Sequence, residues 1–356
     1  MVTLSTKTEK MNGLKSFLSD KNLASSKIIN IAQIGVGYWG PNLLRNLVRN
    51  EHCVIKRIVD LSPDRRDYIK KTYPAINVTG KLEDILNNPD IDAVIIATPV
   101  NTHYDLAVKC LENKKHILVE KPMAKSVEQI SNIEKLAKTN KLVAMVGHTF
   151  LYNPAVRYVK KYIDSGELGE IRYIYSQRLN LGRIRSDVDA LWNLAPHDIS
   201  VIQYWLDNAD PIEINRTGQS YIQQGIDDVV FLNLKYNGGI MANIHVSWLD
   251  PHKVRKLTVV GTKKMIIYDD MIDNKIAILD KGIDPLAEIG KKMDYDNYRN
   301  QNYKHRSGDV IFPKLDWREP LQIEIEHFID CIVNNTNCLT DTAHARKVVR
   351  ILEQAS

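Results

Sequence analysis

Two basic side chains of this sequence are of the kinds that act on alcohols. Lys121 follows an apolar run within Glu120-Lys121-Pro122, and His197 lies four residues after Asn193. A histidine with a pKa near neutrality can take the proton of a hydroxyl group and return it in the reverse reaction. A lysine amine can hydrogen-bond the same oxygen and stabilise its developing negative charge. The alternatives are a lysine in a surface turn and a histidine that caps or packs against its own helix.

Another group of residues, within 28–60, is of the types that bind a dinucleotide. Gly35, Gly37 and Gly40 follow an apolar run in G-x-G-x-x-G spacing and precede a segment with leucines on one helical face. The first glycine permits a tight turn, the second lets the backbone approach a pyrophosphate, and the third lets the helix pack on the strand. Asp60, 20 residues after Gly40, can accept hydrogen bonds from an adenosine ribose. We therefore predict a dinucleotide site, against the alternative of a glycine-rich turn in another α/β domain.

The end of the second apolar run indicates which dinucleotide to expect. A carboxylate at Asp60 repels the 2′-phosphate of NADP and therefore favours NAD. Arg65 and Arg66 follow closely, and they are either candidates to bind such a phosphate or part of the solvated first turn of the next helix. We expect NAD as the cofactor, with NADP less favoured.

These residues need a scaffold in which several strand ends meet, and the first half of the chain has the pattern of one. Apolar runs alternate with helical segments, which predicts a doubly wound parallel sheet. Ligands bind beyond the carboxyl ends of such strands, where we find the glycine turn, residues 98–103 and Glu120-Lys121. We expect strands at 28–34, 54–59, 93–97, 117–119 and 142–146, and helices at 64–72, 82–86, 104–112 with Thr102 as its cap, and 126–138 with a capping box of Ser126 and Gln129.

The second half of the chain has more strand patterns than helical ones. Two runs joined at Gly238-Gly239 predict a β-hairpin, and residues 320–333 carry an apolar stripe at helical spacing. We place His197 in the first turn of a helix at 196–206, whose positive end disfavours imidazolium and helps to keep the residue a base. We expect further helices at 152–163 and 343–353, strands at 172–177, 229–236, 240–248, 254–260, 264–268 and 276–279, and loops at 182–190 and 284–314.

The bulk composition excludes several other functions. The chain has 356 residues, enough for two domains, and a formal net charge of +5 with both signs interleaved, so we expect neither nucleic acid nor a membrane as a partner. No apolar run approaches the roughly 20 residues of a membrane span. The four cysteines contain no C-x-x-C, which argues against a zinc site and fits reduced thiols in a cytoplasmic protein. We predict no metal site.

Taken together, the motifs resemble those of the glucose–fructose oxidoreductase/inositol dehydrogenase (Gfo/Idh/MocA) family. The resemblance runs from about residue 28 to the C-terminal end, and we interpret residues 1–27 as a flexible tail. It implies an NAD(P)-binding Rossmann domain at 28–149, followed at 150–356 by an α/β domain with a large, mostly antiparallel sheet that binds the substrate. The motifs that carry the resemblance are 35–40 with Pro41-Asn42, Ala97-Thr98-Pro99 with His103, 119–124, 192–198, Glu319-Pro320-Leu321, Glu326-His327-Phe328 and Thr340-Asp341.

The resemblance also implies an activity, which is hydride transfer between NAD(P) and a carbon-bound hydroxyl group of a sugar or cyclitol. It assigns Lys121 and His197 to catalysis, together with Asn193, where many members of the family have aspartate. An amide can fix the tautomer of an imidazole but cannot stabilise imidazolium by charge, so Asp189 and Asp198 are candidates to supply that charge. The open face of the second sheet commonly mediates homodimers or homotetramers in this family.

Within the family, the chain resembles the subgroup that works on nucleotide sugars, and we expect oxidation at C-3 of a UDP-N-acetyl-hexosamine or its uronate. The alternatives are a dehydrogenase of free inositol or monosaccharides and a catalytically silent NAD-binding regulator. Arg157, Arg183 and Arg185 are candidates to hold a diphosphate, or they are surface arginines. On resemblance, Tyr152 and Asn153 line the sugar pocket, and the residues expected around the cofactor, beyond the glycines, Asp60, Arg65 and Lys121, are Tyr38, Trp39, Thr98, Pro99, His103 and Glu120.

Overall fold

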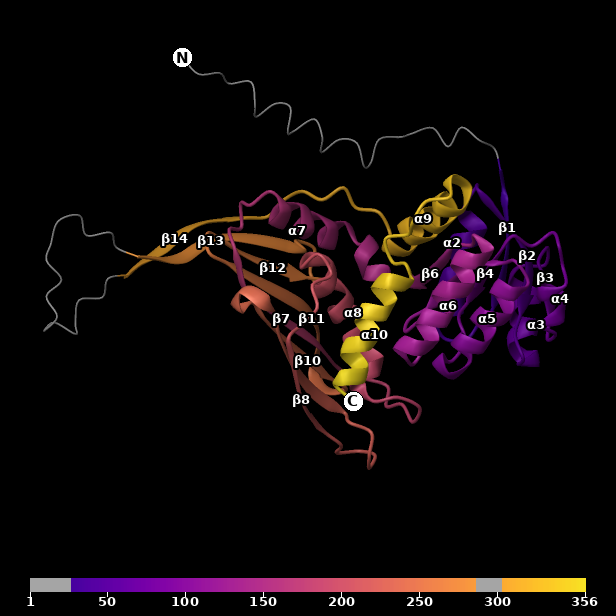
Figure 1. The fold of residues 1–356 in the computed structure, drawn as a ribbon, viewed down its shortest axis with the longest axis horizontal. Helices are drawn as coiled ribbons and strands as arrows, with labels where there is room; N and C mark the ends of the chain where they lie inside the picture. Colours follow the sequence, from indigo (N-terminus) through magenta and orange to yellow (C-terminus); the bar gives the residue numbers. More distant parts are fainter. Residues whose placement is uncertain (1–26, 286–302) are drawn as a thin grey trace, which may run out of the picture.

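Two β-sheets with helices packed against them account for most of the described chain (Figure 1). A computed structural model describes residues 27–285 and 303–356, so the predicted tail lies outside the described residues except for Lys27. In Figure 1 the first sheet and its helices occupy one half of the molecule, and the second, larger sheet occupies the other. The C-terminal helices lie between these halves.

The first sheet has six strands in the order β3-β2-β1-β4-β5-β6, all parallel, which confirms the predicted doubly wound sheet. Its central strands are apolar because helices cover both faces, and all four residues of β4 are buried. The short edge strand β3 was not predicted. The strands are β1 (Ile29–Ile34), β2 (Cys53–Val59), β3 (Asn77–Thr79), β4 (Ala93–Ile96), β5 (His116–Glu120) and β6 (Ala144–Gly147), and the helices are α2 (Gly40–Arg49), α3 (Pro63–Thr72), α4 (Glu83–Leu86), α5 (His103–Glu112) and α6 (Val127–Asn140).

The second sheet has eight strands in the order β14-β13-β12-β11-β7-β10-β9-β8. Every pair is antiparallel except β7 with β10, so the expected mostly antiparallel sheet and the hairpin of β9 and β10 are confirmed. The prediction of a loop at 284–314 is wrong for residues 303–311, which form β14; residues 286–302 lie outside the described chain. The strands are β7 (Ile171–Leu181), β8 (Glu213–Gln219), β9 (Val229–Lys235), β10 (Met241–Ser247), β11 (Leu249–Gly261), β12 (Met265–Asp269), β13 (Ile276–Pro285) and β14 (Tyr303–Ile311).

Helices α7 (Pro154–Asp164) and α8 (Ala190–Trp205) pack on one face of this second sheet. Strand β9 shows the resulting alternation, because Val230, Leu232 and Leu234 are buried while Phe231 between them is 42% exposed. Helix α8 begins six residues before the predicted helix at 196–206. Asp189 caps it by accepting a hydrogen bond from the backbone N–H of Trp192, and Pro196 lies inside it. The proline was taken for a helix start, which is its commonest helical position.

Three smaller predictions about helix starts need correction. The Thr102 side chain does not cap α5, because its hydroxyl donates to the backbone oxygen of Pro99 instead. Ser126 caps α6 as expected, but Gln129 accepts from the backbone N–H of Lys125, so the reciprocal half of the capping box is absent. Helix α7 begins at Pro154, and Tyr152 belongs to the preceding 3-10 turn η3 (Thr149–Tyr152).

The C-terminal helices connect the two halves of the molecule. Helix α9 (Pro320–Asn334) contacts α2 and η3, and α10 (Thr342–Gln354) contacts α6 and α8. Between them, Asp341 forms a β-bridge with Met145 of β6, and one apolar core includes buried residues of both sheets. Across the described residues, no helix has both the length and the apolar composition needed to cross a bilayer.

Candidate active site

The glycine turn after β1 is as tight as its spacing predicts. Gly35 has φ +91°, and a Cβ on it would lie 2.5 Å from the carbonyl oxygen of Ala97. A Cβ on Gly40 would lie 2.5 Å from the carbonyl oxygen of Gly35, so only glycine lets α2 pack this closely on the strand. Buried Gln33 closes the turn, because its Nε2 donates to the carbonyl oxygens of both Gly35 and Gly40.

The same turn fits the phosphates and the ribose of a dinucleotide. A Cβ on Gly37 would meet only the guanidinium of Arg65, at 3.4 Å, which leaves this backbone approachable. No side chain caps α2, so N–H groups at its start are available to an anion. The Asp60 carboxylate orients the turn by accepting 2.8 Å hydrogen bonds from the backbone N–H groups of Val36 and Ser62.

The other predicted cofactor residues differ in what they can contact. Arg65 extends its guanidinium to 3.6 Å from Asp60, whereas Arg66 donates to the backbone oxygens of Asp60 and Leu61. Tyr38 is 89% exposed at the turn. Trp39, just before α2, and Pro99, after β4, are also exposed. The hydroxyl group of Thr98 forms a hydrogen bond with that of Thr102.

His103 is not placed to touch a cofactor, contrary to the prediction. Its side chain is buried, and its two ring nitrogens each lie 2.8 Å from a backbone oxygen, those of Pro122 and Thr98. Burial lowers the pKa of this imidazole. His103 therefore holds the ends of β4 and β5 in register, and it positions the residues that follow these strands.

Lys121 reaches from the end of β5 to the catalytic segment proposed on α8. Its Nζ donates a 2.8 Å hydrogen bond to the backbone oxygen of Asn193. Burial lowers the pKa of this amine to about 8, opposed by the neighbouring Glu120 and assisted by the positive charge of Arg178. Burial raises the pKa of Glu120 to about 7, against the stabilising charge of Lys121.

His197 lies on the same helix as Asn193, one turn further along, because α8 begins at Ala190 and not at the predicted residue 196. The explanation given for its basicity is wrong, because His197 lies in the middle of α8 and not in its first turn. Burial lowers the pKa of His197 well below its usual value, followed by the positive charges of Lys121 and Arg178. The imidazole is therefore neutral, as a base must be, and it packs edge-on against Phe150 with 5.1 Å between ring centroids.

Neither predicted aspartate is available to stabilise imidazolium. Asp198 is bound to Arg178, and Asp189 caps α8 and pairs with Arg216. Within the described chain, buried Nδ1 of His197 has no hydrogen-bond partner. The interaction that the structure gives Asn193 is through its backbone oxygen to Lys121.

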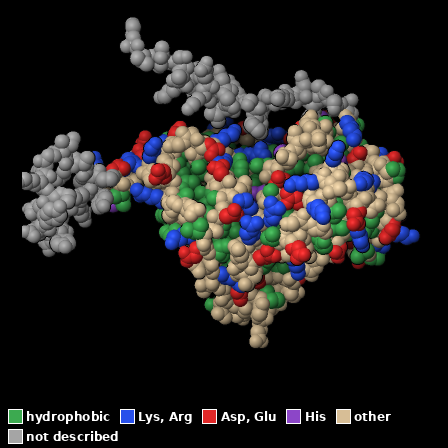
Figure 2. Space-filling view, in the orientation of Figure 1, with side chains coloured by type: hydrophobic (Ala, Val, Ile, Leu, Met, Phe, Trp, Pro, Cys, Tyr) green, Lys and Arg blue, Asp and Glu red, His purple; other side chains and the backbone are tan. Residues whose placement is uncertain are grey.

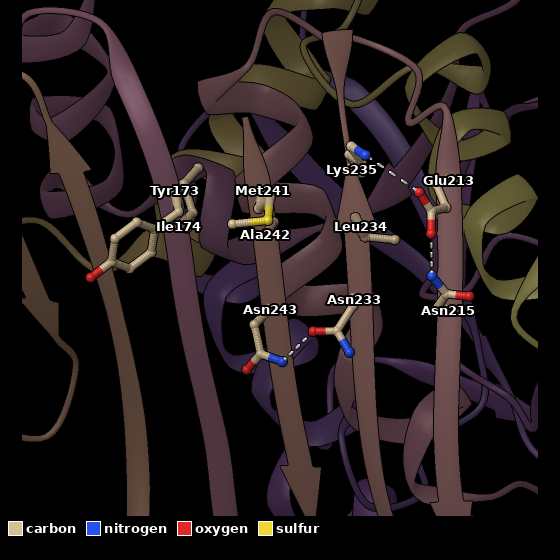
Figure 3. Close-up of a pocket in the computed structure, with 10 residues that line it drawn as sticks. All are labelled: Tyr173, Ile174, Glu213, Asn215, Asn233, Leu234, Lys235, Met241, Ala242 and Asn243. Atoms are coloured by element: carbon tan, nitrogen blue, oxygen red, sulfur yellow. Dashed lines mark hydrogen bonds and ion pairs between the residues drawn. The ribbon is translucent and has the colours of Figure 1, made fainter. Parts of the chain in front are cut away.

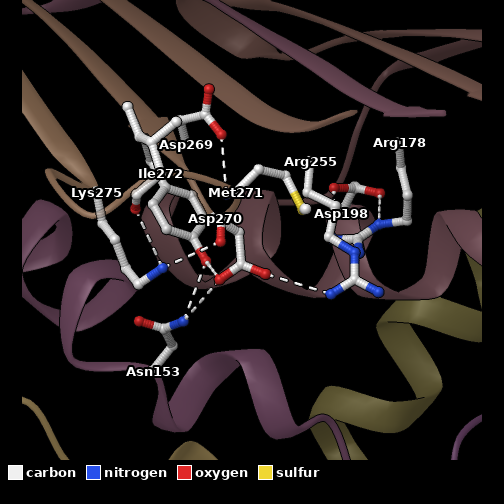
Figure 4. Close-up of polar contacts among 10 residues, drawn as sticks. Asn153, Arg178, Asp198, Arg255, Asp269, Asp270, Met271, Ile272 and Lys275 are labelled. Carbon is white, nitrogen blue, oxygen red and sulfur yellow. Dashed lines mark hydrogen bonds and ion pairs between the residues drawn. The ribbon is translucent and has the colours of Figure 1, made fainter. Parts of the chain in front are cut away.

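A polar cluster on the second sheet lies close to these residues (Figure 4). Arg178 on β7 forms hydrogen bonds of 2.7 and 3.1 Å with Asp198 on α8, and both are buried. Arg255 on β11 approaches Asp270 at 3.3 Å. Buried Asn153 caps α7, and its side-chain amide donates a 3.1 Å hydrogen bond to the Tyr268 hydroxyl. It therefore supports this cluster, and it does not line a pocket in this structure, contrary to the prediction.

Two further residues predicted to bind substrate have structural roles. Tyr152 is fully buried, and its hydroxyl bonds Thr340, so it cannot line a pocket in this structure. Arg157 donates a hydrogen bond to the backbone oxygen of Leu151, and its guanidinium lies over the Tyr152 ring. These contacts are with the protein's own core. Arg183 lies exposed in the loop before α8 and stays a candidate.

The region around Lys121 and His197 is rich in positive charge. Arg178, Arg185 and Arg255 all lie close enough to alter the pKa of one or both of these groups. Each arginine is paired with one aspartate, Arg185 with Asp187 among them. Lys121 adjoins Glu120, and because burial raises the pKa of Glu120 to about 7, the lysine charge is only partly offset near neutral pH. Figure 2 shows Lys and Arg side chains gathered near the middle of the visible face, with acidic side chains among them. Such a site favours an anionic ligand.

The sequence interpretation missed three charged residues of this region. Arg178 lies in phase with buried Ile174 and Ser176 on β7, so a charged side chain on the inward face was the available signal. Arg255 had no such signal. Glu324 occurs within the apolar stripe of α9, is fully buried, and accepts a hydrogen bond from Thr149, and burial raises its pKa well above its usual value.

Comparison with known proteins agrees with this geometry. Residues 29–148 match the oxidoreductase family with an NAD-binding Rossmann fold, and residues 156–267 match the Gfo/Idh/MocA C-terminal domain. The chain belongs to the Gfo/Idh/MocA family. It is therefore an NAD-binding oxidoreductase by family, as the sequence motifs indicated.

Relatives within the Gfo/Idh/MocA family carry different names. The chain is 27% identical over 329 residues to scyllo-inositol 2-dehydrogenase (NAD⁺) of Bacillus subtilis, covering 88% of this chain and 89% of the relative. It is 26% identical over 338 residues to 2,7-anhydro-N-acetylneuraminate hydratase of Mediterraneibacter gnavus, with 90% and 88% covered. UDP-N-acetylglucosamine 3-dehydrogenase of Acidithiobacillus ferrooxidans is 24% identical over 261 residues, with 73% and 76% covered. A solved structure of the Acidithiobacillus enzyme superposes with a TM-score of 0.75 at 21% identity, covering 92% of this chain and 96% of that one, which supports the fold.

Proposed function

We propose that this chain transfers hydride between NAD and a secondary alcohol of a nucleotide-linked sugar, at C-3 of a UDP-N-acetyl-hexosamine or its uronate. The observation that supports this most is the meeting of Lys121 with the helix that carries His197. The Lys121 amine donates a hydrogen bond to the backbone oxygen of Asn193, one helical turn from His197, and after burial its positive charge is the largest influence that lowers the pKa of His197. One alcohol can therefore contact an ammonium donor and a neutral imidazole.

The roles of His197 and Lys121 follow from their protonation states. Neutral His197 accepts the hydroxyl proton, and protonated Lys121 donates a hydrogen bond to the same oxygen as its charge develops. NAD held at the glycine turn by Gly35, Gly37 and Asp60 would supply the hydride acceptor for the carbon of that alcohol, or the hydride donor in the reverse reaction. Lys121 holds its ammonium in place before the substrate arrives, because the carbonyl oxygen of Asn193 orients it.

An anionic, nucleotide-linked sugar is favoured over a neutral polyol by charge. Arg178 and Arg255 face the catalytic pair, and the exposed Arg183 follows on the loop before α8. Arginine pairs well with carboxylates and diphosphates because its donors form a fork. The Arg255–Asp270 pair is a single 3.3 Å contact, partly exposed, so Arg255 can turn to a substrate carboxylate. The UDP-N-acetylglucosamine dehydrogenase among the relatives has a name of this substrate class.

The second candidate is a dehydrogenase of free inositol or monosaccharides, which the name of the Bacillus relative favours. Thermal unfolding of the NAD-loaded enzyme with UDP-sugars, UDP-sugar uronates and free polyols separates the two, because only a true ligand stabilises the folded state. NADH formation with the same compounds then tests turnover. Stabilisation by polyols alone would overturn the nucleotide-sugar proposal. If a compound binds but no NADH forms with any of them, and no product appears, a catalytically silent regulator would be favoured. If a product forms without net NADH, a reaction such as that named for the hydratase relative would be favoured.

We infer NAD as the cofactor over NADP. The Asp60 carboxylate is buried at the end of β2 and is held in place by two backbone donors, and a carboxylate at this position would repel a 2′-phosphate. Arg65, whose guanidinium lies 3.6 Å from this carboxylate, is positioned to offset this repulsion in part. Equal rates with NAD and NADP would overturn the inference.

We also propose that the chain forms a homodimer or homotetramer through the open face of the second sheet, within the division of 28–149 and 150–356. Figure 3 shows part of this face, where a depression of about 390 Å³ lies over β7, β10, β9 and β8. Large apolar side chains are exposed here, including Tyr173 and Met241. This depression is on the opposite face from α8, so it is not the substrate site.

A further inference from the structure

A cluster of soft metal ligands lies at the C-terminal end of α9, and the proposed hydride transfer uses none of its members. His327 and Cys331 are one helical turn apart, and Cys338 comes from the segment that follows the helix. The three ligand atoms all lie within 4.8 Å of one another. The cysteine spacing alone predicted no metal site, because it did not consider a histidine four residues before Cys331.

The distance between His327 and Cys331 is that of a tetrahedral site. Zinc lies about 2.3 Å from sulfur and about 2.0–2.1 Å from nitrogen, which separates the two ligand atoms by about 3.5 Å. Nε2 of His327 lies 3.5 Å from Sγ of Cys331. The backbone N–H of Leu339 donates to this Nε2 at 2.9 Å, so the nitrogen is unprotonated, as a ligand must be. This N–H would have to release Nε2 when a metal binds.

The two sulfur atoms come from different segments and are close enough to bind one ion. Sγ of Cys331 and Sγ of Cys338 lie within 4.8 Å of each other, and both cysteines are buried. Thiolates are common ligands of zinc in structural sites.

We propose that His327, Cys331 and Cys338 form a binding site for a thiolate-preferring divalent ion of the zinc type. Nε2 and the two Sγ atoms supply three ligands, and a water molecule completes the tetrahedron. The partly exposed His327 gives an ion access from solvent, while Cys331 is fully buried. Three protein ligands and a solvent position predict weaker retention than in a four-cysteine site.

The ion would join two segments that hold the halves of the molecule together. Cys338 precedes Thr340, whose backbone oxygen accepts from Val146 of β6 and whose hydroxyl donates to the backbone oxygen of Val146. Strand β6 leads directly to His148, which lies close enough to His197 to lower its pKa. A metal at this site would therefore stabilise the seam beside the active site without entering the chemistry.

The test uses the whole reduced chain, stripped with a chelator and titrated with Co²⁺ and then Zn²⁺. We expect one Co²⁺ per chain with a thiolate-to-cobalt charge-transfer band, displaced by Zn²⁺, and a higher unfolding temperature with Zn²⁺. Cys338→Ser and, as a second variant, Cys338→Ala should weaken binding at least about tenfold, whereas Cys53→Ser, which alters a buried cysteine of β2, should bind as the parent does.

Three results would overturn the proposal. The first is a chain that gives no thiolate band with Co²⁺, and the second is an equal band in the Cys338 variants. The third is a disulfide between Cys331 and Cys338 in the protein purified without a reductant, detected as the loss of two titratable thiols without bound metal. None of these measurements depends on dehydrogenase activity, so they leave the proposed function to its own tests.

Discussion

The amine of Lys121 must carry a positive charge to assist oxidation of the alcohol, and yet it is buried close to two arginines. The adjacent Glu120 stabilises this charge, and the backbone oxygen of Asn193 accepts a hydrogen bond from the amine. Burial and the charges of Arg178 and Arg185 lower the pKa of the amine. His197 is kept neutral by the same surroundings. One electrostatic environment therefore sets both the acid and the base of the proposed reaction.

Removal of the Lys121 amine should separate binding from turnover. In Lys121→Ala we expect NAD affinity to stay within a few-fold of the parent, because the phosphates and ribose contact the glycine turn. Turnover should fall by about 10²–10³-fold, as it does when one donor to a developing oxyanion is lost. NAD binding by calorimetry and NADH formation measure the two effects. Lys125→Ala, an exposed lysine four residues on, is the control, and undiminished turnover in Lys121→Ala would contradict the assignment.

The alkaline pH dependence should belong to the same amine. A pKa of about 8 means that Lys121 loses its proton above that pH, so kcat/KM for oxidation should decline by about tenfold for each further pH unit. His197 has a lowered pKa, so no decline is expected as pH falls through 6.5. Lys121→Arg keeps its charge at all these pH values and should move the alkaline decline upward. An unchanged decline in that variant would assign it to another group.

At the scale of elements, the glycine turn combines two separable functions. A Cβ on Gly40 meets the backbone of Gly35, whereas a Cβ on Gly37 meets only the movable end of Arg65. The first position concerns the packing of α2 on β1. The second concerns the room left for a pyrophosphate.

Alanine substitutions should therefore give opposite results at these two glycines. Gly40→Ala should lower the free energy of unfolding of the NAD-free protein by about 1–3 kcal/mol, the usual cost of overpacking. Gly37→Ala should leave that stability nearly unchanged and weaken NAD binding at least about tenfold, because the methyl group occupies the approach to the phosphates. Urea unfolding and calorimetry measure both quantities. If Gly37→Ala bound NAD normally, the dinucleotide would not pass over this turn.

The sequence predicted the first sheet better than the second, for a physical reason. Buried parallel strands such as β4 are continuous apolar runs, which few other structures require. Strand β8 alternates weakly and β14 is polar, because both lie at the edges of the second sheet and depend on pairing with β9 and β13. A polar edge strand carries little apolar pattern of its own, so the local sequence gives a weak signal for it. The start of α8 was missed because Pro196 lies inside a helix that Asp189 caps.

At the scale of the whole molecule, the candidate site depends on contacts that no single segment encodes. The motifs predict roles for Lys121 and His197, but the Arg178–Asp198 pair joins β7 to α8 across 20 residues and carries no motif. Tyr152 was assigned to a pocket, although it lies in the core beneath Thr340. Whether a polar side chain faces a ligand or the core depends on which element covers it, and here the C-terminal segment supplies that cover.

The open face of the second sheet gives the last prediction. Residues Tyr173, Phe231 and Met241 are 44%, 42% and 56% exposed on neighbouring strands, and a second copy of the chain would cover them. Met241→Arg places a charge within that interface, and burying an unpaired charge costs more than a surface substitution. We expect this variant to be a monomer by light scattering while the parent is a dimer or tetramer. Tyr68→Arg, on α3 and also 56% exposed at the parent residue, should keep the parent's mass, and a Met241→Arg variant that did the same would exclude this face as the interface.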